Sequence, residues 1–170
     1  MALNLELKAR IPSLSQAVKI AKRLTGSSPT ILHQVDLYYK IPKGRLKLRI
    51  INRRRAELIF YQRPNKKGGR YSRYLILPLE DVQLARLFFA TAFQQRICVE
   101  KKRHLFLYKN ARIHLDEVTG LGSFLEFEIV VQGEKRQARQ LFLFLKERFH
   151  IQDKDVLAGS YSDLLMRAKA

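Results

Sequence analysis

Hydrophobic and polar residues alternate over much of this chain with the period of two that is typical of β-strands. The first run extends from Leu3 to Ile11 and places Glu6, Lys8 and Arg10 on one face. The breaks between successive runs are short, which favours antiparallel neighbours. Further strands are expected in three runs between Ile31 and Arg63, and then at Tyr71 to Leu77, Gln95 to Arg103, Leu105 to Tyr108, Arg112 to Val118 and Phe124 to Val131.

Apolar residues at helical spacing predict helices between and after these strands. The first helix follows Ser13, a typical capping residue, and stops at Gly26. Others are expected at Asp81 to Phe93, around Ala138 to Phe149, and at Tyr161 to Lys169. About eight or more antiparallel strands tend to curl and close. We therefore expect an α+β fold in which helices cover the outer apolar face of a closed sheet.

Charged side chains occupy one face of strand after strand. In any single strand this face could simply be solvated. The same pattern across so many strands instead predicts that the charges line the interior of the closed sheet. The bases that share this face are Lys8, Arg10, Lys47, Arg49, Arg63, Arg70, Lys101, Arg103 and Arg112, and the acids are Glu6, Glu57, Asp116, Glu126 and Glu128.

This interior predicts both an anion and a cation as ligands. So many cations cannot be buried together without anions to pair them, and a polyphosphate supplies such anions. The acids on the same faces indicate a hard divalent ion, because Mg²⁺ is held by a few carboxylates plus phosphate oxygens. Glu126 and Glu128 are two residues apart, about 6.6 Å along a strand, so they can flank a metal directly or through water.

Composition and net charge say more about the binding partners of this protein than about its fold. A chain of 170 residues suits one domain, taken as residues 1–170. Its 33 Lys and Arg against 15 Asp and Glu give a net charge of +18, which attracts polyanions. Cys98 stands alone, so no intrachain disulfide can form and a cytoplasmic location is expected. No uncharged apolar run approaches the roughly 20 residues of a membrane helix, so no membrane partner is expected.

Several ordered blocks resemble the CYTH superfamily, the triphosphate tunnel metalloenzymes, and most closely its class IV adenylyl cyclase-like branch. The resemblance runs over nearly the whole chain. Its blocks are Asn4-Leu5-Glu6-Leu7-Lys8, Gly44-Arg45-Leu46-Lys47-Leu48-Arg49, Glu57 to Pro64 with Arg70 to Tyr74, Val99-Glu100-Lys101-Lys102-Arg103, and Arg112-Ile113-His114-Leu115-Asp116 through Glu128.

The resemblance implies an eight-stranded antiparallel tunnel that binds Mg²⁺ or Mn²⁺ and a triphosphate. Members act as adenylyl cyclases, thiamine triphosphatases, tripolyphosphatases or RNA triphosphatases, so ATP, thiamine triphosphate and tripolyphosphate are the expected partners. Fold follows more safely from such a resemblance than reaction does. By position, Glu6, Asp116, Glu126 and Glu128 match metal-side carboxylates, and Lys8, Arg10, Lys47, Arg49, Arg63, Lys101, Arg103 and Arg112 match phosphate-side bases.

One departure from the family pattern concerns the metal. Asn4 replaces the first Glu of the N-terminal motif, which keeps an oxygen donor but removes a negative charge. A metal at that end should therefore be held less tightly. The resemblance to the class IV branch implies a cyclase, with a triphosphatase as an alternative, and Asn4 is the main argument for a further alternative, a non-catalytic polyphosphate binder. A basic module that binds nucleic acid is a further alternative, although acids on the same face oppose it. No general base is evident, and His114 is the one candidate for proton transfer.

Overall fold

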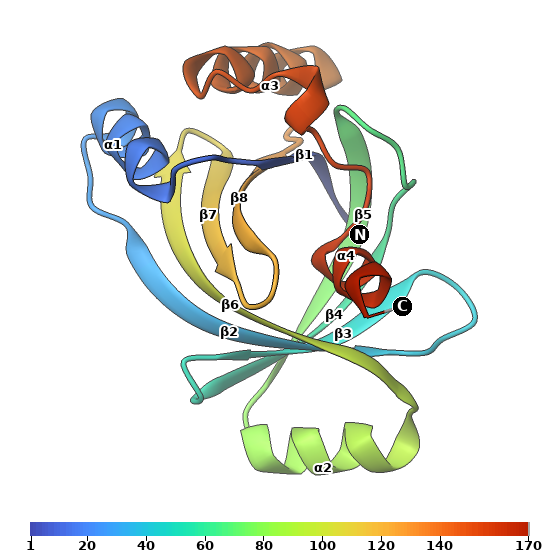
Figure 1. The fold of residues 1–170 in the computed structure, drawn as a ribbon. Helices are drawn as coiled ribbons and strands as arrows, with labels where there is room; N and C mark the ends of the chain where they lie inside the picture. Colours follow the sequence, from blue (N-terminus) through green and yellow to red (C-terminus); the bar gives the residue numbers. More distant parts are fainter. Residues whose placement is uncertain (170) are drawn as a thin grey trace.

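Each of the eight strands has two antiparallel neighbours, so the sheet closes on itself (Figure 1). The computed structural model describes residues 1–169. The strand order around the barrel is β1-β5-β4-β3-β2-β6-β7-β8. The prediction of an α+β fold built on a closed antiparallel tunnel is confirmed. The strands are β1 (Ala2–Arg10), β2 (Thr30–Tyr39), β3 (Arg45–Ile51), β4 (Arg55–Gln62), β5 (Arg70–Leu79), β6 (Gln95–Tyr108), β7 (Ala111–Val118) and β8 (Gly122–Val130), and the helices are α1 (Leu14–Thr25), α2 (Val82–Ala92), α3 (Lys135–Arg148), a 3-10 turn (Asp153–Asp155) and α4 (Tyr161–Ala168).

The period-two alternation sorts side chains between the interior and the outer surface of the barrel. On β1, Asn4, Glu6 and Lys8 line the interior, whereas Leu5 and Leu7 belong to an outer hydrophobic core. The predicted charged interior is therefore confirmed. Outer apolar faces of this kind need helices to cover them.

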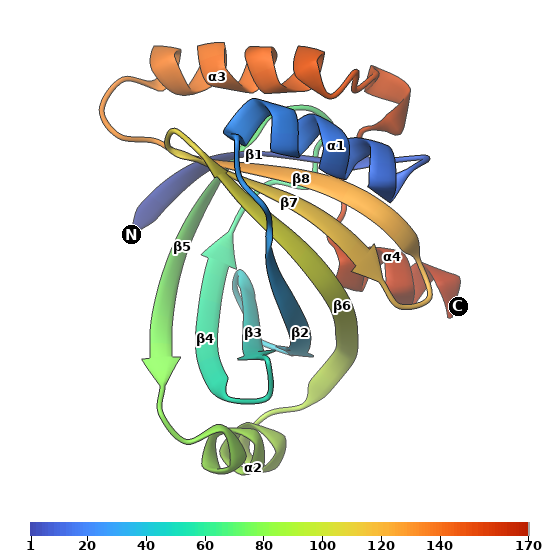
Figure 2. The ribbon, with the colours of Figure 1, turned by 90° about the vertical axis from the view of Figure 1, so that its left-hand side faces the viewer.

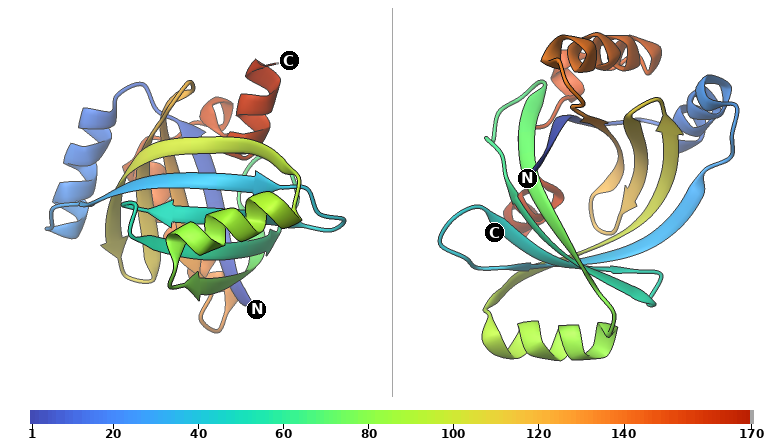
Figure 3. Two further views of the ribbon diagram at one scale, coloured as in Figure 1. Left: turned by 90° about the horizontal axis from the view of Figure 1, so that it is seen from below. Right: turned by 180° about the vertical axis from the view of Figure 1, so that it is seen from behind.

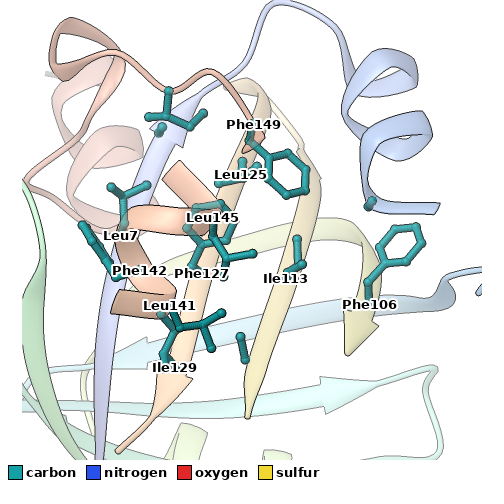
Figure 4. Close-up of a cluster of buried hydrophobic side chains, with 14 of the residues drawn as sticks. Leu7, Phe106, Ile113, Leu125, Phe127, Ile129, Leu141, Phe142, Leu145 and Phe149 are labelled. Carbon is teal, nitrogen blue, oxygen red and sulfur yellow. The ribbon is translucent and has the colours of Figure 1, made fainter. Parts of the chain in front are cut away.

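Helices α1 and α3 cover one half of the barrel, over β1, β6, β7 and β8 (Figure 2). Leu7 of β1, Phe127 of β8 and Leu145 of α3 are fully buried in this core. Figure 4 shows their side chains pointing toward one another between α3 and the strands. Removing a buried leucine from such a core costs about 2–5 kcal/mol. The core thus fixes the orientation of β1 and β8, which carry acids on their inner faces.

Helix α2 covers the opposite outer face, where it lies across β3 and β4 (Figure 3). Its Ala85 and Phe89 pack with Leu48 and Ile50 of β3. Helix α4 is different because it packs against inward-facing side chains. Tyr161 and other apolar residues of α4 join a cluster that includes Tyr38, Ile59, Tyr61 and Val99. Helix α4 therefore fills one end of the barrel.

One prediction of secondary structure was wrong. Gln95 to Arg103 and Leu105 to Tyr108 were expected as two strands, but they form the single 14-residue strand β6. The apolar run Leu105-Phe106-Leu107 interrupts the visible alternation although the backbone stays extended. Leu105 lines the interior while Phe106 joins the outer core. Both faces of the strand are apolar at that point, and this hides the period of two.

No helix within residues 1–169 is both long enough and apolar enough to cross a lipid bilayer.

Candidate functional site

The barrel encloses a cavity of about 310 Å³ lined mainly by charged and polar side chains. It lies between the inner faces of all strands, with Tyr161 of α4 at one end. Most of the site residues predicted from the sequence meet here. Those that line the cavity are Glu6, Lys8, Lys47, Arg49, Arg63, Lys101, Arg103, Arg112, His114, Glu126 and Glu128.

Strands β1, β8 and β7 lie side by side and form an acidic wall of the cavity. Their register places Glu6 opposite Glu128, and it places His114 opposite Glu126 and Arg112 opposite Glu128. Because paired residues point to the same side of a sheet, all five side chains face the interior. Glu6 of β1 therefore shares one wall with Glu126 and Glu128 of β8, although more than 100 residues separate them in sequence.

Both carboxylates of β8 bind bases, and Glu126 binds two, because Arg103 Nη2 also donates to its Oε2 atom at 3.4 Å. Lys8 Nζ lies 3.0 Å from Glu126 Oε1, and Arg112 Nε donates to Glu128 Oε2 at 3.0 Å. The other two oxygens, Glu126 Oε2 and Glu128 Oε1, face Nδ1 of His114 at 3.8 and 4.0 Å. These distances are too long for hydrogen bonds. Burial, together with the nearby Arg103 charge, lowers the pKa of His114, so its ring is neutral near pH 7.

Glu6 is the carboxylate of this wall that lacks a close cationic partner among the described residues. Its Oε2 atom is 3.9 Å from Arg63 Nε and from Arg70 Nε. Burial, followed by repulsion from Glu128 and Glu126, raises the pKa of Glu6 to about 7. An additional cation beside these acids would favour the charged form of Glu6.

The acidic wall therefore fits a divalent metal. Glu6, Glu126 and Glu128 offer hard oxygen donors of the kind that bind Mg²⁺ or Mn²⁺. Asn4 shares the inner face of β1 with Glu6, and its buried Oδ1 atom has no hydrogen-bond partner within residues 1–169. An unpaired buried oxygen is costly unless a ligand satisfies it. Because ligands must be deprotonated, metal binding here should strengthen as the pH rises through 7.

A basic wall on β2, β3 and β6 lies around Asp36, a residue that sequence reasoning missed. Arg49 binds both Asp36 oxygens at 2.7 and 2.8 Å, and Lys47 and Lys101 approach Oδ2 at 3.0 and 2.8 Å. Burial opposes its ionisation, but these bases hold the pKa of Asp36 well below its usual range. Gln34, Asp36 and Tyr38 do alternate with apolar neighbours on β2. That alternation is the sequence feature that could have placed Asp36 on the inner face of the barrel.

Two lysines of the cavity, Lys8 and Lys101, have lowered pKa values. Burial lowers the pKa of Lys101 to about 7 despite its contact with Asp36, because Arg49, Arg103 and Lys47 also repel it. Burial likewise lowers the pKa of Lys8 to about 8, against the attraction of Glu126. An entering anion would stabilise the protonated form of both lysines.

Three predicted site residues lie outside the cavity lining. Asp116 is fully buried behind Arg103, which it binds through both oxygens at 2.7 Å, and it also accepts a hydrogen bond from Tyr161 at 2.9 Å. Although burial opposes its charge, Arg103 lowers the pKa of Asp116 to about 2. Arg70 is also fully buried and donates to the backbone carbonyls of Leu157 and Ala158.

Arg10, the third of these residues, is exposed at the end of β1. Its guanidinium donates to the Leu121 carbonyl at 3.0 Å and lies 4.9 Å from the Phe124 ring centroid. β1 leaves the barrel at this point, so its next residues no longer face the interior. Arg55, Glu57 and Ser160 line the cavity in addition to the residues predicted as ligands.

Several solved structures share this architecture. The PH1012 protein from Pyrococcus horikoshii is 21% identical, with a TM-score of 0.77, and the match covers 95% of this chain and 98% of that one. A candidate adenylate cyclase from Vibrio parahaemolyticus is 20% identical, with a TM-score of 0.76 and coverage of 96% and 98%. HpAC1 from Hippeastrum, a candidate adenylyl cyclase with dominant triphosphatase activity, is 15% identical, with a TM-score of 0.69 and coverage of 99% and 96%. At these identities the similarity shows the fold alone.

A comparison with functionally curated proteins finds no match. The profile of the CYTH domain matches residues 2–161. This match spans all eight strands, including those that carry the acidic and basic walls. The chain therefore belongs to the CYTH domain family.

Proposed function

We propose that this protein binds ATP with a divalent cation and converts it to cyclic AMP and pyrophosphate, as a class IV adenylyl cyclase-like enzyme. One observation carries the proposal. A single cavity joins a basic wall around Lys47, Arg49 and Lys101 to an acidic wall that contains Glu6, Glu126 and Glu128. A triphosphate needs such bases, and a metal needs such acids within reach of the same phosphates.

The far end of the cavity favours a nucleotide over inorganic tripolyphosphate. Along β2, β3 and β6 the inner face changes from charged side chains to Leu32, Ile51 and Leu105, away from α4, while Arg55 and Glu57 of the adjacent β4 keep charges at the same end. A phosphate chain gains nothing from apolar contacts, whereas a nucleoside buries apolar surface against them. We therefore place the nucleoside at this end and the phosphates toward α4.

In the cyclase reaction the ribose O3′ forms a bond to the α-phosphorus, the bond from that phosphorus to the pyrophosphate oxygen breaks, and the O3′ proton passes to solvent. Lys47, Arg49 and Lys101 would neutralise charge on the phosphate oxygens. Asp36 holds these bases in place before any ligand binds, which limits the reorganisation needed. Mg²⁺ or Mn²⁺ on Glu6, Glu126 and Glu128 would supply further neutralisation at the leaving group. We assign Asp116 to positioning Arg103 and Tyr161.

A triphosphatase is the second candidate. The same cavity would serve if water, instead of O3′, attacked the terminal phosphorus. HpAC1, which shares this fold, is described as having dominant triphosphatase activity. The two reactions differ in which phosphorus is presented to the nucleophile, so the products distinguish them directly.

The test is incubation with ATP, tripolyphosphate and thiamine triphosphate in Mg²⁺ or Mn²⁺, with cyclic AMP, pyrophosphate and phosphate measured separately. Cyclic AMP with pyrophosphate supports the cyclase, and phosphate alone supports the triphosphatase. Lys47→Gln should weaken either activity, whereas Lys43→Gln, on the neighbouring exposed turn, should not. Metal-dependent binding of a triphosphate without any product would indicate a non-catalytic binder. Nucleic-acid binding without triphosphate affinity would overturn the proposal.

A further inference from the structure

His114 is the one nitrogen donor in the cluster of possible metal ligands that the structure describes. Nδ1 of His114 and one oxygen each from Glu126 and Glu128 all lie within 4.8 Å of one another. The His114 side chain is 4% exposed. Its Nδ1 atom has no hydrogen-bond partner within residues 1–169. A buried, unpaired ring nitrogen that points at two carboxylates requires an explanation.

The two carboxylates present to this nitrogen the oxygens that Lys8 and Arg112 do not bind, and the Glu126 oxygen also accepts a 3.4 Å hydrogen bond from Arg103 Nη2. Lys8 binds the other oxygen of Glu126, and Arg112 binds the other oxygen of Glu128. Two donors bound to one metal at about 2.1 Å can be up to about 4.2 Å apart. The observed separations from Nδ1, 3.8 and 4.0 Å, fall within that span. One ion could therefore contact all three groups after small side-chain movements.

We propose that His114 Nδ1 is a metal ligand together with Glu126 and Glu128, and that it makes this site prefer Mn²⁺ or Co²⁺ over Mg²⁺. The inference rests on the proposed function, because it concerns the metal of the same cavity. Imidazole favours first-row transition metals, whereas all-oxygen sites suit Mg²⁺. Asn4 strengthens the argument, because a neutral amide at that position leaves fewer negative oxygen donors for Mg²⁺. A ligand role would also remove His114 as a proton carrier.

Pulsed electron paramagnetic resonance of the purified full chain with Mn²⁺ tests the contact directly, without substrate. Coupling of the manganese to a histidine ¹⁴N nucleus is expected in the wild type. Its absence in Mn²⁺-loaded wild-type protein would overturn the inference, whatever the variants do. If neither Mn²⁺ nor Mg²⁺ binds, both this inference and the proposed function fail.

The preference is tested by calorimetric titration of Mn²⁺, Co²⁺ and Mg²⁺ into wild type and His114→Asn. The amide replaces the ring nitrogen by a small oxygen donor, so the Mn²⁺ to Mg²⁺ affinity ratio should fall about tenfold or more. His104→Asn is the matched control, since that ring lies on the outer face of β6 against the Leu115 carbonyl. An unchanged ratio in a folded His114→Asn protein would refute the preference.

Discussion

Replacing Asp36 by asparagine tests whether one carboxylate holds the basic wall together. Asp36 is 1% exposed and contacts Lys47, Arg49 and Lys101, of which Lys101 is also buried. Asparagine has nearly the same shape but no charge, so the three bases would face one another without an anion. The change removes charge pairing with little loss of packing.

The expected loss of stability is large. Breaking a buried ion pair by removing one partner costs about 3–5 kcal/mol, because the remaining charge stays buried and uncompensated. Lys101 reduces this loss in part, since burial and neighbouring bases already lower its pKa to about 7 and it can release its proton. For a chain of this size each kcal/mol shifts Tm by about 2–4 °C. A decrease of about 6–20 °C is therefore expected for Asp36→Asn.

Urea unfolding followed by circular dichroism measures the free energy, with midpoint and slope fitted separately. Asp153→Asn is the matched control, because Asp153 also pairs with a lysine, Lys146, but its side chain is 94% exposed. This control should leave the unfolding midpoint unchanged. A loss below about 1 kcal/mol in Asp36→Asn would refute the idea that the bases depend on this carboxylate.

Measuring Tm with and without tripolyphosphate tests whether the same bases bind a ligand. An anion that enters the cavity can pair with the bases that Asp36 no longer neutralises. The ligand should therefore raise the Tm of Asp36→Asn by more than it raises that of the wild type. An equal or smaller rise would mean that the phosphates bind elsewhere.

Three further predictions concern β1. Asn4→Glu should raise Mg²⁺ affinity measured by calorimetry, because it adds a charged oxygen donor beside Glu6, and an unchanged affinity would mean that position 4 does not touch metal. Because burial and the charges of Glu128 and Glu126 raise the pKa of Glu6 to about 7, the native state keeps a proton that the unfolded chain loses near 4.5. In EDTA, the free energy of unfolding of the wild type relative to Glu6→Gln should therefore fall by about 3 kcal/mol between pH 4.5 and 7 and stay level above it. Arg10→Ala should leave triphosphate affinity unchanged, since Arg10 lies outside the cavity, and a marked loss would place phosphate at the end of β1.

The inner face of the barrel could be predicted because the period of two is a local property of the sequence. Lys47 and Arg49, or Glu126 and Glu128, lie two apart and must share a face wherever the strand goes. A single acid on a strand is weaker evidence for an inner-face role than a pair of charged residues two positions apart. Asp36 is the one carboxylate on β2. Its role in holding the basic wall depends on contacts between strands, because it pairs with Arg49 of β3 and binds Lys101 of β6.

Contacts with the C-terminal segment could not be predicted in this way. Asp116 and Arg70 belong to the inner-face pattern, yet Tyr161 covers Asp116 and the carbonyls of Leu157 and Ala158 bind Arg70. These contacts join residues 45 or more positions apart. Sequence periodicity reports the face of a strand but not what packs against its end. Side chains at the α4 end were therefore predicted as ligands although some of them hold the fold.

The basic wall and the acidic wall differ in charge, so the two sides of the cavity attract different ligands. Around Asp36 one carboxylate serves three bases, which leaves an excess of positive charge. Around Glu6 no base in the described part of the chain lies closer than 3.9 Å, and burial together with the charges of Glu128 and Glu126 raises its pKa to about 7. On the proposed function, we therefore expect phosphates at one wall and a metal ion at the other, and each ligand should lower the cost of binding the other. Metal affinity should accordingly rise when a triphosphate is bound, and a barrel that bound either ligand independently of the other would contradict this account of its charges.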